Sequence, residues 1–268
     1  MRASTRNNVR IRGTRARPVI FAHGLGCDQA VWRYIAPGFE PDHRVILFDQ
    51  VGAGGSVLSA YDRDKYSTLS GYADDLLEIC RELDLRSVVF VGHSVSAMVG
   101  VLAAVKEPQR FERLVLVAPS PRYLHDDGYP SGFARYEIDE LLLLLDTNVA
   151  EWATILGPAI MGNLERPELA AELTRNFCRT DPEILRHFAR VTFLSDNRAE
   201  LSRLRTPSLI LQCDQDVVAP ESVGEYMHRH LPCSTLVKMQ ATGHCPHLSA
   251  PQETSTLIRE YLRRPLPS

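Results

Sequence analysis

The sequence lacks an excess of charge of either sign. Its 268 residues include 30 Lys and Arg and 33 Asp and Glu, which leaves a net charge of −3 with histidine neutral. A chain this close to neutrality exerts no general electrostatic attraction on nucleic acid or on an anionic membrane. We therefore expect a small, uncharged ligand, with neither nucleic acid nor a membrane as a partner.

Long apolar runs are missing as well. No segment approaches the roughly 18 apolar residues that a membrane span needs, and the arginine-rich residues 1–17 hold no apolar stretch for a secretory signal. An arginine-rich start can also be an organellar transit sequence. Here, however, Val9 and Ile11 alternate with arginines as in a half-exposed first strand. The sequence accordingly predicts a cytoplasmic protein.

Paired cysteines are absent too. The six cysteines are scattered without a CxxC pair, at Cys27, Cys80, Cys178, Cys213, Cys233 and Cys245. This spacing argues against a zinc ribbon, a redox motif or a disulfide scaffold. We expect reduced, partly buried thiols and no bound metal ion.

What the chain does contain is a regular alternation of short apolar, β-rich runs with helical segments. These runs occupy residues 18–23, 44–49, 87–92, 113–118, 208–213 and 235–239. Strands that alternate with helices in this way form a parallel sheet with helices on both faces. The predicted fold class is therefore α/β, with a mostly parallel sheet at its centre.

Residues 121–200 break this rhythm, because they contain several helical runs and no strand-like one. Within them, Asp181 suits a helix N-cap and Pro182 the first helical position. An insertion after about the fourth strand of a parallel sheet lies over the carboxyl ends of the strands, where such sheets bind ligands. We therefore predict a helical cap at 121–200 on one integrated core formed by 1–120 and 201–268.

Large apolar side chains are frequent in this insertion. Leu141 to Leu145 would make one helix apolar all round, which predicts that this helix is buried under the cap or faces the pocket. Phe133, Trp152 and Phe193 could line a pocket or could simply pack against neighbouring helices. The residues by themselves leave both roles open.

One strand-like run ends in a turn of small residues with a serine at its centre. Residues 92–96 read GHSVS, which matches the G-x-S-x-G pattern of a nucleophile elbow except that serine replaces the last glycine. A strand precedes this turn and a helix follows it. Residues 23–26 (HGLG) end an earlier strand, where the second oxyanion donor is expected. We predict that Ser94 is a nucleophile and not merely a helix cap.

A serine nucleophile needs a histidine base and an acid that orients the base. In folds with this elbow the chain order is nucleophile, acid, histidine, and the acid follows a late strand. Asp214 and Asp216 follow the run at 208–213, and His244 follows the run at 235–239. All of these loops lie at the same edge of the predicted sheet. The residues favour Asp216 as the acid, with Asp214 as the alternative.

Three other histidines lie near these motifs. His247 is the rival base, but its place further along the final loop favours a structural role or a place at the pocket rim. His23 and His93 flank the elbow in the predicted fold. We expect both to be hydrogen-bonded packing and not catalysts.

Several longer motifs carry a more specific resemblance. They are HGLGCDQAVW (23–32), FDQVGAGGS (48–56), GHSVSAM (92–98), APSPRY (118–123), FCRTDP (177–182) and ATGHCPHLSAP (241–251). Together they resemble the α/β-hydrolases grouped with the bacterial stress regulator RsbQ, a group that includes the plant karrikin and strigolactone receptors. The similarity runs from about residue 8 to residue 262, with the insertion included.

The resemblance implies an α/β-hydrolase fold with a four-helix cap over an apolar pocket. It implies a catalytic triad of Ser94, Asp216 and His244. The backbone N–H groups of Leu25 and Val95 would form the oxyanion hole. No metal ion or organic cofactor takes part in the mechanism of this group.

The resemblance also bears on the ligand. Phe133, Trp152 and Phe193 match positions that line the pocket in such relatives. Leu25 departs from the pattern, because many relatives have phenylalanine there. The shape of the pocket mouth is therefore expected to differ, and the identity of the ligand does not carry over.

The function implied is that of a serine hydrolase for a small apolar ester or lactone, with a role in signalling. Proteins like RsbQ act upstream of a phosphatase that contains a PAS domain, whereas the plant relatives hydrolyse a butenolide hormone and recruit protein partners. One alternative is a ligand-sensing module with slow turnover that binds a protein partner. Others are a stand-alone esterase, a cofactor-free haloperoxidase or a C–C bond hydrolase, because this fold hosts several chemistries.

Overall fold

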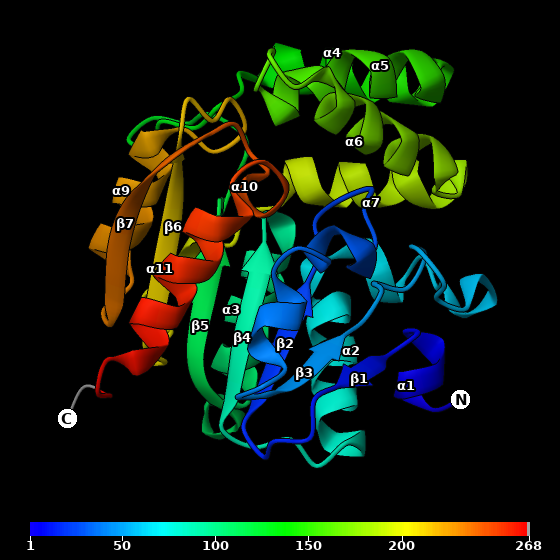
Figure 1. Cartoon of the computed structure of the whole chain (residues 1–268). Helices are drawn as coiled ribbons and strands as arrows, with labels where there is room; N and C mark the ends of the chain where they lie inside the picture. Colours follow the sequence, from blue (N-terminus) through cyan, green and yellow to red (C-terminus); the bar gives the residue numbers. More distant parts are fainter. Residues whose placement is uncertain (267–268) are drawn as a thin grey trace.

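A seven-stranded sheet forms the centre of the molecule (Figure 1). The computed structural model describes residues 1–266. The strands are β1 (Arg10–Arg12), β2 (Pro18–Ala22), β3 (Arg44–Leu47), β4 (Val88–His93), β5 (Phe111–Val117), β6 (Ser208–Asp214) and β7 (Ser234–Thr242). Their order across the sheet is β1-β3-β2-β4-β5-β6-β7, and every neighbouring pair is parallel except β1 and β3. The mostly parallel sheet predicted from the sequence is confirmed.

The central strands are covered on both faces. Every residue of β2 and β4 is buried, as expected where helices cover both sides of a parallel sheet. Alternate side chains point to opposite faces, so Val19 and Phe21 pack on one side and Ile20 and Ala22 on the other. The continuous apolar character of these runs is therefore what sets their depth in the molecule.

The edge strand β1 follows a different rule. All three of its residues are exposed, and Ile11 keeps 42% of its surface in contact with solvent. The alternation at residues 9–12 thus predicted a strand correctly. Its half-burial holds for Val9, which precedes β1 and packs partly against the core, but is wrong for Ile11. The cause is that β1 pairs antiparallel with β3 at the edge of the sheet. Its residues do not belong to the buried apolar core on either face of the sheet.

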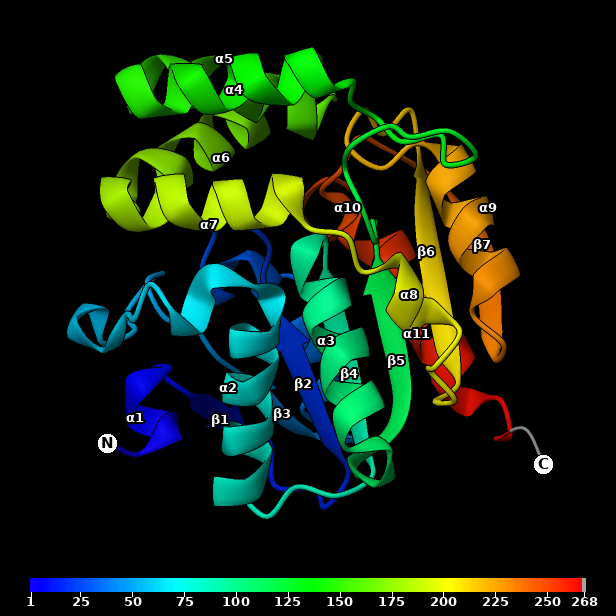
Figure 2. The ribbon, with the colours of Figure 1, turned by 180° about the vertical axis from the view of Figure 1, so that it is seen from behind.

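Helices cover the two faces of the sheet unequally. On one face lie α2 (Leu69–Glu82), α3 (Val95–Lys106) and α9 (Glu221–His230), and on the other lie α11 (Pro251–Arg263) and the short 3₁₀ helices η1 (Gln29–Trp32) and η2 (Ala36–Phe39). Figure 2 shows α2 and α3 side by side in front of the sheet. The short helix α1 (Ala3–Arg6) packs on α2 through an ion pair of 2.8 Å between Arg6 Nη2 and Asp75 Oδ1. The N-terminal segment is in this way fastened to the core.

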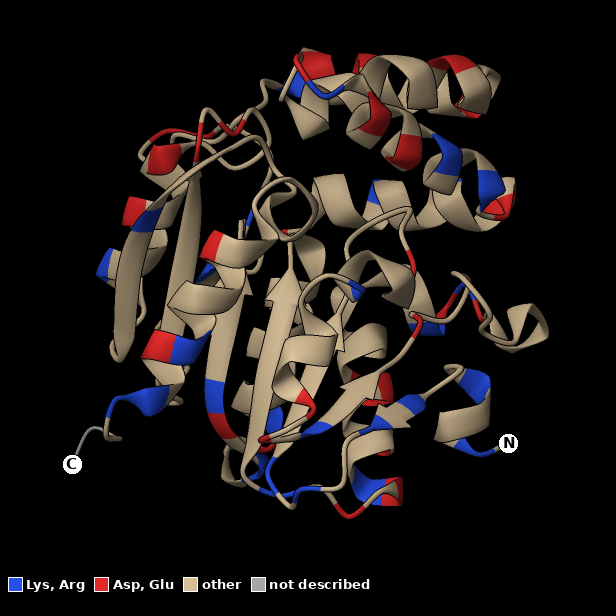
Figure 3. Cartoon of the chain, in the orientation of Figure 1, with Lys and Arg blue, Asp and Glu red and all other residues tan. Residues whose placement is uncertain are grey.

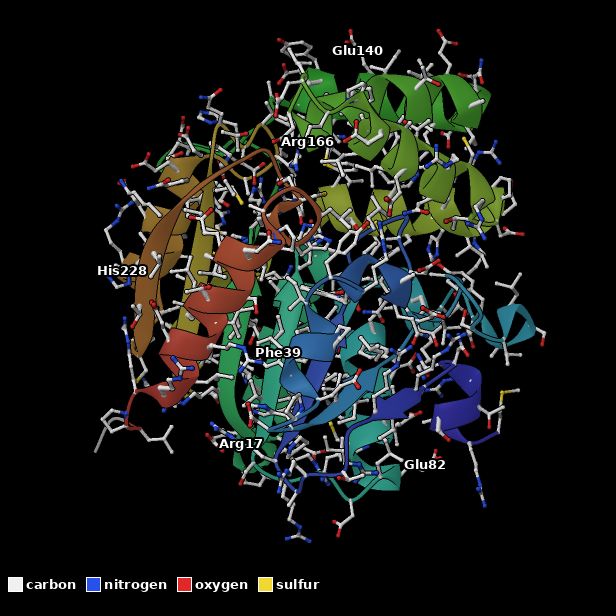
Figure 4. The ribbon with its side chains drawn as sticks, in the orientation of Figure 1. Arg17, Phe39, Glu82, Glu140, Arg166 and His228 are labelled. Carbon is white, nitrogen blue, oxygen red and sulfur yellow. The ribbon has the colours of Figure 1, made fainter. Side chains whose placement is uncertain are left out.

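Four helices stand over the carboxyl ends of the strands (Figures 1 and 2). They are α4 (Arg135–Thr147), α5 (Val149–Met161), α6 (Pro167–Arg179) and α7 (Pro182–Leu194), and all fall within the stretch predicted as a cap. Asp181 caps α7 as expected, because its carboxylate accepts hydrogen bonds from the N–H groups of Glu183 and Ile184. Figure 4 shows Arg166 in the turn between α5 and α6, where its guanidinium donates to the carbonyl oxygen of Ser249 in the body. We call these four helices the cap.

Helix α4 corrects one expectation. Leu142 and Leu145 are buried, but Leu143 exposes 63% of its surface. Glu140 on the same helix points away from the body (Figure 4). The prediction that this helix is apolar all round and buried is therefore wrong, because α4 forms the outer layer of the cap and only one of its faces meets the other helices.

Charged side chains lie mainly on the outside of the molecule. Figure 3 shows Lys and Arg interspersed with Asp and Glu over the surface, while the middle of the sheet carries few charges. In the part of the chain that the structure describes, no helix has the length and apolar character to cross a membrane. All six cysteines lie within that part, and all are free.

The packing of α3 on β4 yields a test of the fold. A Cβ added at Gly100 would lie 2.2 Å from Cε1 of Phe90, a buried ring that also packs edge-on against Phe111. Alanine gains about 1 kcal/mol over glycine in a helix, whereas overpacking a core costs about 1–3 kcal/mol. Taking the middle of the overpacking cost less the helix gain, we expect Gly100→Ala to lower the free energy of unfolding by about 1 kcal/mol, measured by chemical denaturation.

The matched control is Gly38→Ala, where the nearest atom to the added Cβ is 3.5 Å away at the tip of Arg259. This variant should leave the stability nearly unchanged. A Gly100→Ala protein as stable as the parent would contradict the tight contact between α3 and β4.

Candidate active site

Ser94 occupies a sharp turn between β4 and α3. Its backbone has φ 55° and ψ −125°, a conformation that a non-glycine residue rarely adopts and that surrounding structure must hold in place. The turn needs small neighbours, because a Cβ added at Gly92 would lie 2.6 Å from the carbonyl oxygen of Ser96. A strained strand-to-helix turn of this kind is the geometry of a nucleophile elbow.

Three side chains that are far apart in the sequence meet at this turn. His244 Nε2 lies 2.7 Å from Ser94 Oγ, and His244 Nδ1 lies 2.7 Å from Asp216 Oδ2. All three residues are buried. In this arrangement Nδ1–H donates to the carboxylate, which leaves Nε2 free to accept the hydroxyl proton of Ser94.

The structure separates the two candidate acids. The other oxygen of Asp216, Oδ1, accepts hydrogen bonds from the N–H groups of Val218 (2.9 Å) and Ala219 (3.0 Å). Asp214 is instead exposed, and the side chain of Gln215 is its partner. The backbone turns between them, because Gln215 has a positive φ of 48°. Asp216 is thus the carboxylate that reaches the imidazole.

The main chain of His244 is held by both the cap and the core. Its N–H donates to the carbonyl oxygen of Ile160 in α5 at 2.9 Å, and its own carbonyl oxygen lies 2.8 Å from His93 Nε2. Gly243 makes the approach of α5 possible, because its φ is 76° and a Cβ there would lie 2.1 Å from the carbonyl oxygen of Met161. The position of this imidazole therefore depends on how the cap docks.

The neighbouring histidines pack around the site. His23 Nε2 accepts from the N–H of Gln50 at 3.0 Å, and His93 holds the backbone of His244, so both are hydrogen-bonded packing as predicted. His247 is fully buried, with its ring 4.3 Å from that of His93 and 4.7 Å from that of Trp32. Burial lowers the pKa of His247 to about 3 and keeps the pKa of His93 well below its usual range. These rings stay neutral near pH 7.

The two residues predicted for the oxyanion hole are Val95, which follows Ser94 in the chain, and Leu25, which lines the same cavity. Val95 begins α3, and the first N–H groups of a helix have no acceptor within the helix. Leu25 follows the end of β2 and lines the cavity next to Ser94. Both residues thus belong to the surroundings of Ser94, and their role as oxyanion donors stays a prediction.

A cavity lies between the sheet and the cap, above Ser94. Its lining is mostly apolar and consists of Leu25, Cys27, His93, Ser94, Tyr123, Ile160, Leu173, Phe177, Thr192, Phe193, Val218, His244 and Cys245. The centre of a water-sized molecule can reach about 30 Å³ of this space, which corresponds to about two water positions. A larger ligand therefore requires its walls to move apart.

The three aromatic residues predicted for the pocket do not share one position. Phe193 lines the cavity. Phe133 lies behind it, with ring centroids 6.0 Å apart, and Trp152 lies behind Phe177 at 4.9 Å. Neither Phe133 nor Trp152 belongs to the lining among the described residues. Both support the side chains that do, because each packs edge-on against a lining ring.

Tyr123 is a site residue that sequence reasoning missed. Its hydroxyl lies 3.5 Å from Ser94 Oγ, and its ring packs against Phe193. Burial raises the pKa of this hydroxyl, so it stays protonated. The available signal was its place at residue 123, a few positions after the strand-like run at 113–118 and hence at the carboxyl edge of the sheet.

Two thiols also face the cavity. Burial raises the pKa of Cys27 to about 12, and burial raises the pKa of Cys245 as well. Because the thiolate is the reactive form of cysteine, neither thiol is a reactive nucleophile near pH 7. Among the described residues, no group of three or more histidine, cysteine or acidic side chains is arranged to hold a metal ion.

The chain is similar to known proteins along nearly its whole length. Residues 19–257 match the alpha/beta hydrolase family. Over 261 residues the chain is 38% identical to the strigolactone esterase D14 of Arabidopsis thaliana, covering 97% of this chain and 96% of that protein. It is 34% identical over 261 residues to the karrikin insensitive 2 receptor IA of Petunia hybrida, covering 97% and 95% of the two chains.

A solved structure is similar to the same extent. The structure of a hydrolase from Oleispira antarctica matches with a TM-score of 0.95 and 38% identity, covering 98% of this chain and 97% of that one. The match therefore includes the sheet, the loops around Ser94 and the cap.

The buried histidines make the stability depend on pH in a defined direction. His247 stays neutral in the folded state down to pH values near 3, whereas an unfolded histidine takes up a proton below about pH 6.5. The unfolded state then binds more protons, so the free energy of unfolding falls as the pH falls from about 6.5 towards 3. We expect His247→Phe to reduce the loss between pH 6.5 and 5 by about 2 kcal/mol.

The measurement is chemical denaturation of the parent and the variant at several pH values. His228→Gln is the control, because His228 is exposed on α9 (Figure 4) and both buried rings remain. Equal pH slopes for the parent and His247→Phe would refute the assignment of a neutral buried imidazole.

Proposed function

Because this chain belongs to the alpha/beta hydrolase family, we propose that it hydrolyses small apolar esters or lactones with Ser94 as the nucleophile. The observation that carries the proposal is the unbroken hydrogen-bonded chain from Ser94 through His244 to Asp216, with 2.7 Å at each step. A serine hydroxyl is a weak nucleophile until a base within this distance can take its proton. The geometry meets that requirement in a buried setting.

In the proposed first step, His244 takes the proton of Ser94 while Oγ attacks the carbonyl carbon of the substrate. The C–O π electrons move onto the carbonyl oxygen and give a tetrahedral oxyanion. Asp216 remains ionised, holds the imidazole in the required tautomer and stabilises the imidazolium that forms. Its second oxygen is already occupied by two backbone N–H groups, which keeps the carboxylate oriented.

The backbone N–H groups of Leu25 and Val95 are proposed to receive the oxyanion. Donors that are fixed before the reaction stabilise the developing charge without reorganisation, and the loss of one donor typically costs about 10²–10³ in turnover. Val95 is suited to this role because its N–H opens helix α3, where the helix dipole adds a partial positive charge.

The intermediate then collapses in two stages. His244 returns its proton to the leaving oxygen as the C–O bond of the ester breaks, which leaves an acyl group on Ser94. Water, activated by the same imidazole, attacks the acyl carbon, and the acid product leaves with the serine hydroxyl restored. In a lactone the leaving oxygen and the acyl group belong to one product.

The cavity supports the proposed substrate class. Most of its wall is aliphatic, aromatic or thiol, so a small apolar acyl or lactone group is favoured over a charged one. The relatives support an ester, since one is named a strigolactone esterase. Phe193 is the proposed aromatic wall of the substrate site, with Phe133 and Trp152 as supporting rings.

A second candidate function is a ligand sensor of the RsbQ type, in which slow hydrolysis serves a switch and the output is a protein contact. Two observations favour it. One relative is named a receptor, and the cap exposes Leu143, Ile155 and Leu164 to solvent. The partner proposed from the resemblance is a phosphatase that contains a PAS domain.

The triad proposal is tested by single substitutions assayed on short p-nitrophenyl esters. Ser94→Ala, His244→Ala and Asp216→Asn should each lower kcat by at least about 10³-fold, because the triad acts as a unit. Asp214→Asn is the matched control and should keep nearly full activity, since that carboxylate is exposed and does not reach the imidazole. Turnover unchanged in a folded Ser94→Ala protein would end the proposal.

The sensor proposal is tested by affinity and not by turnover. With a butenolide lactone present, the Kd for a purified PAS-containing phosphatase should fall relative to the ligand-free value, and Leu164→Glu should weaken binding at unchanged ester hydrolysis. Leu164 exposes 89% of its surface, so this variant should fold normally. Fast turnover together with an affinity that the lactone does not alter would favour a stand-alone esterase.

A further inference from the structure

Thr192, in the wall of the apolar cavity, carries a buried hydroxyl that has no hydrogen-bond partner among the described residues. It lies on α7, the cap helix nearest the body in Figures 1 and 2, and it lines the cavity together with Ser94. Its side chain is 2% exposed, and Oγ1 has no hydrogen-bond partner among the described residues. A buried hydroxyl left unpaired costs about 1–3 kcal/mol, so its presence in this wall needs an explanation.

The other helical threonines of the cap behave differently. Thr147, Thr154, Thr174 and Thr180 each donate the hydroxyl to the carbonyl oxygen four residues earlier in the helix. This is the usual way in which a threonine inside a helix satisfies its hydroxyl. Thr192 makes no such bond to Phe188. The hydroxyl of Thr192 is therefore not hydrogen-bonded to its own helix, whereas the other four hydroxyls are.

Most of the other oxygen and nitrogen atoms of the cavity wall lie at or next to Ser94. Ser94 and His244 bond to each other, and the hydroxyl of Tyr123 is next to Ser94 Oγ. His93 Nδ1 is also unpaired, but it is pressed against the backbone at Gly24, where an added Cβ would lie 2.7 Å from it. Thr192 is thus the polar group of the described lining that is available to a ligand without disturbing Ser94.

We propose that Thr192 is a specificity-determining residue, whose hydroxyl binds a second oxygen of the substrate away from the scissile carbonyl. This inference rests on the proposed hydrolysis of an ester or lactone in the same cavity. A hydroxyl can donate to an ether or carbonyl oxygen and can accept from an alcohol. The favoured substrates are therefore small esters or lactones that carry one additional uncharged oxygen, and purely hydrocarbon chains are second best.

The selectivity proposed for Thr192 comes from comparing a substrate that carries the additional oxygen with an analogue that lacks it. A site built to hydrogen-bond a substrate oxygen discriminates against an analogue without that oxygen, because its own polar group then stays buried and unpaired. Away from Ser94 and the polar groups next to it, the wall consists of aliphatic, aromatic and thiol side chains, which satisfy a polar substrate oxygen poorly. Thr192 therefore favours substrates with this oxygen. Its position also determines where along the acyl chain of the substrate the oxygen has to be.

The experiment uses matched p-nitrophenyl esters in which one CH₂ is replaced by oxygen. The pairs are butanoate with methoxyacetate, pentanoate with 3-methoxypropanoate, and hexanoate with 4-methoxybutanoate. The quantity measured is the ratio of kcat/KM for the oxygen-containing ester to that for its hydrocarbon partner. Taking this ratio relative to the parent protein removes differences in the intrinsic reactivity of the esters.

For at least one pair, Thr192→Val should lower this ratio by about 2- to 10-fold, the effect of one net hydrogen bond. Thr192→Ser keeps the hydroxyl and should retain the ratio of the parent. Thr154→Val is the matched control on the same cap, because that hydroxyl bonds to its own helix on the surface. A ratio that Thr192→Val leaves unchanged for all three pairs would overturn the inference.

A binding arm separates this inference from the proposed hydrolysis. The Kd values of 2-heptanone and 5-methoxy-2-pentanone, which cannot be hydrolysed, are measured by NMR titration on the parent, Thr192→Val and Ser94→Ala. A preference for the methoxy ketone that Thr192→Val loses supports the inference even if ester turnover proves independent of Ser94. Suppose that ester hydrolysis depends on Ser94 but that Thr192→Val changes neither the kcat/KM ratio of the esters nor the Kd ratio of the two ketones. This result would retain the proposed function and reject the role of Thr192.

Discussion

The site depends on one buried imidazole being held from every side. The side chain of His244 is fixed by Ser94 and Asp216. Its main chain is fixed by Ile160 of the cap and by His93 of the elbow. An imidazole with two occupied nitrogens and two occupied backbone groups has little freedom to rotate away, so the cost of orienting it is met during folding and not during a reaction. The core, the elbow and the cap therefore act as one frame for this residue.

The burial of these side chains has two further effects on the site. Hydrogen bonds away from water are electrostatically stronger than exposed ones, which favours the chain from Ser94 to Asp216. The same burial penalises charge, so His93 and His247 remain neutral near His244 and place no positive charge beside the imidazolium of the proposed mechanism. The thiols of Cys27 and Cys245 stay protonated for the same reason.

The cap shapes the cavity as much as the sheet does. Phe193, Phe177 and Thr192 come from α6 and α7, whereas Ser94 and the backbone next to it come from the core. Chemistry and ligand selection are thus divided between two parts of one chain. The two parts remain coupled, because α5 holds the backbone of His244, the proposed base.

Local sequence patterns predict much of the sheet and of the candidate site. Apolar runs of strand length predict the central strands, since a strand covered on both faces must be apolar throughout. The GHSVS turn and the order of Ser94, Asp216 and His244 place the candidate residues at one sheet edge, because parallel strands end on the same side. The failures are equally local in origin. The alternation at Val9 and Ile11 carries no information on which strands lie at the edge of the sheet.

Contacts between segments that are distant in the chain were decided only by the tertiary structure. The choice between Asp214 and Asp216 rests on the turn at Gln215 and on where His244 arrives from 28 residues away. The inward position of Phe193, the supporting positions of Phe133 and Trp152, and the unpaired hydroxyl of Thr192 depend on how the cap helices rotate onto the body. Sequence periodicity determines which residues are apolar and which can bear chemistry. It does not determine which of them face one another, because facing is set by packing across the whole fold.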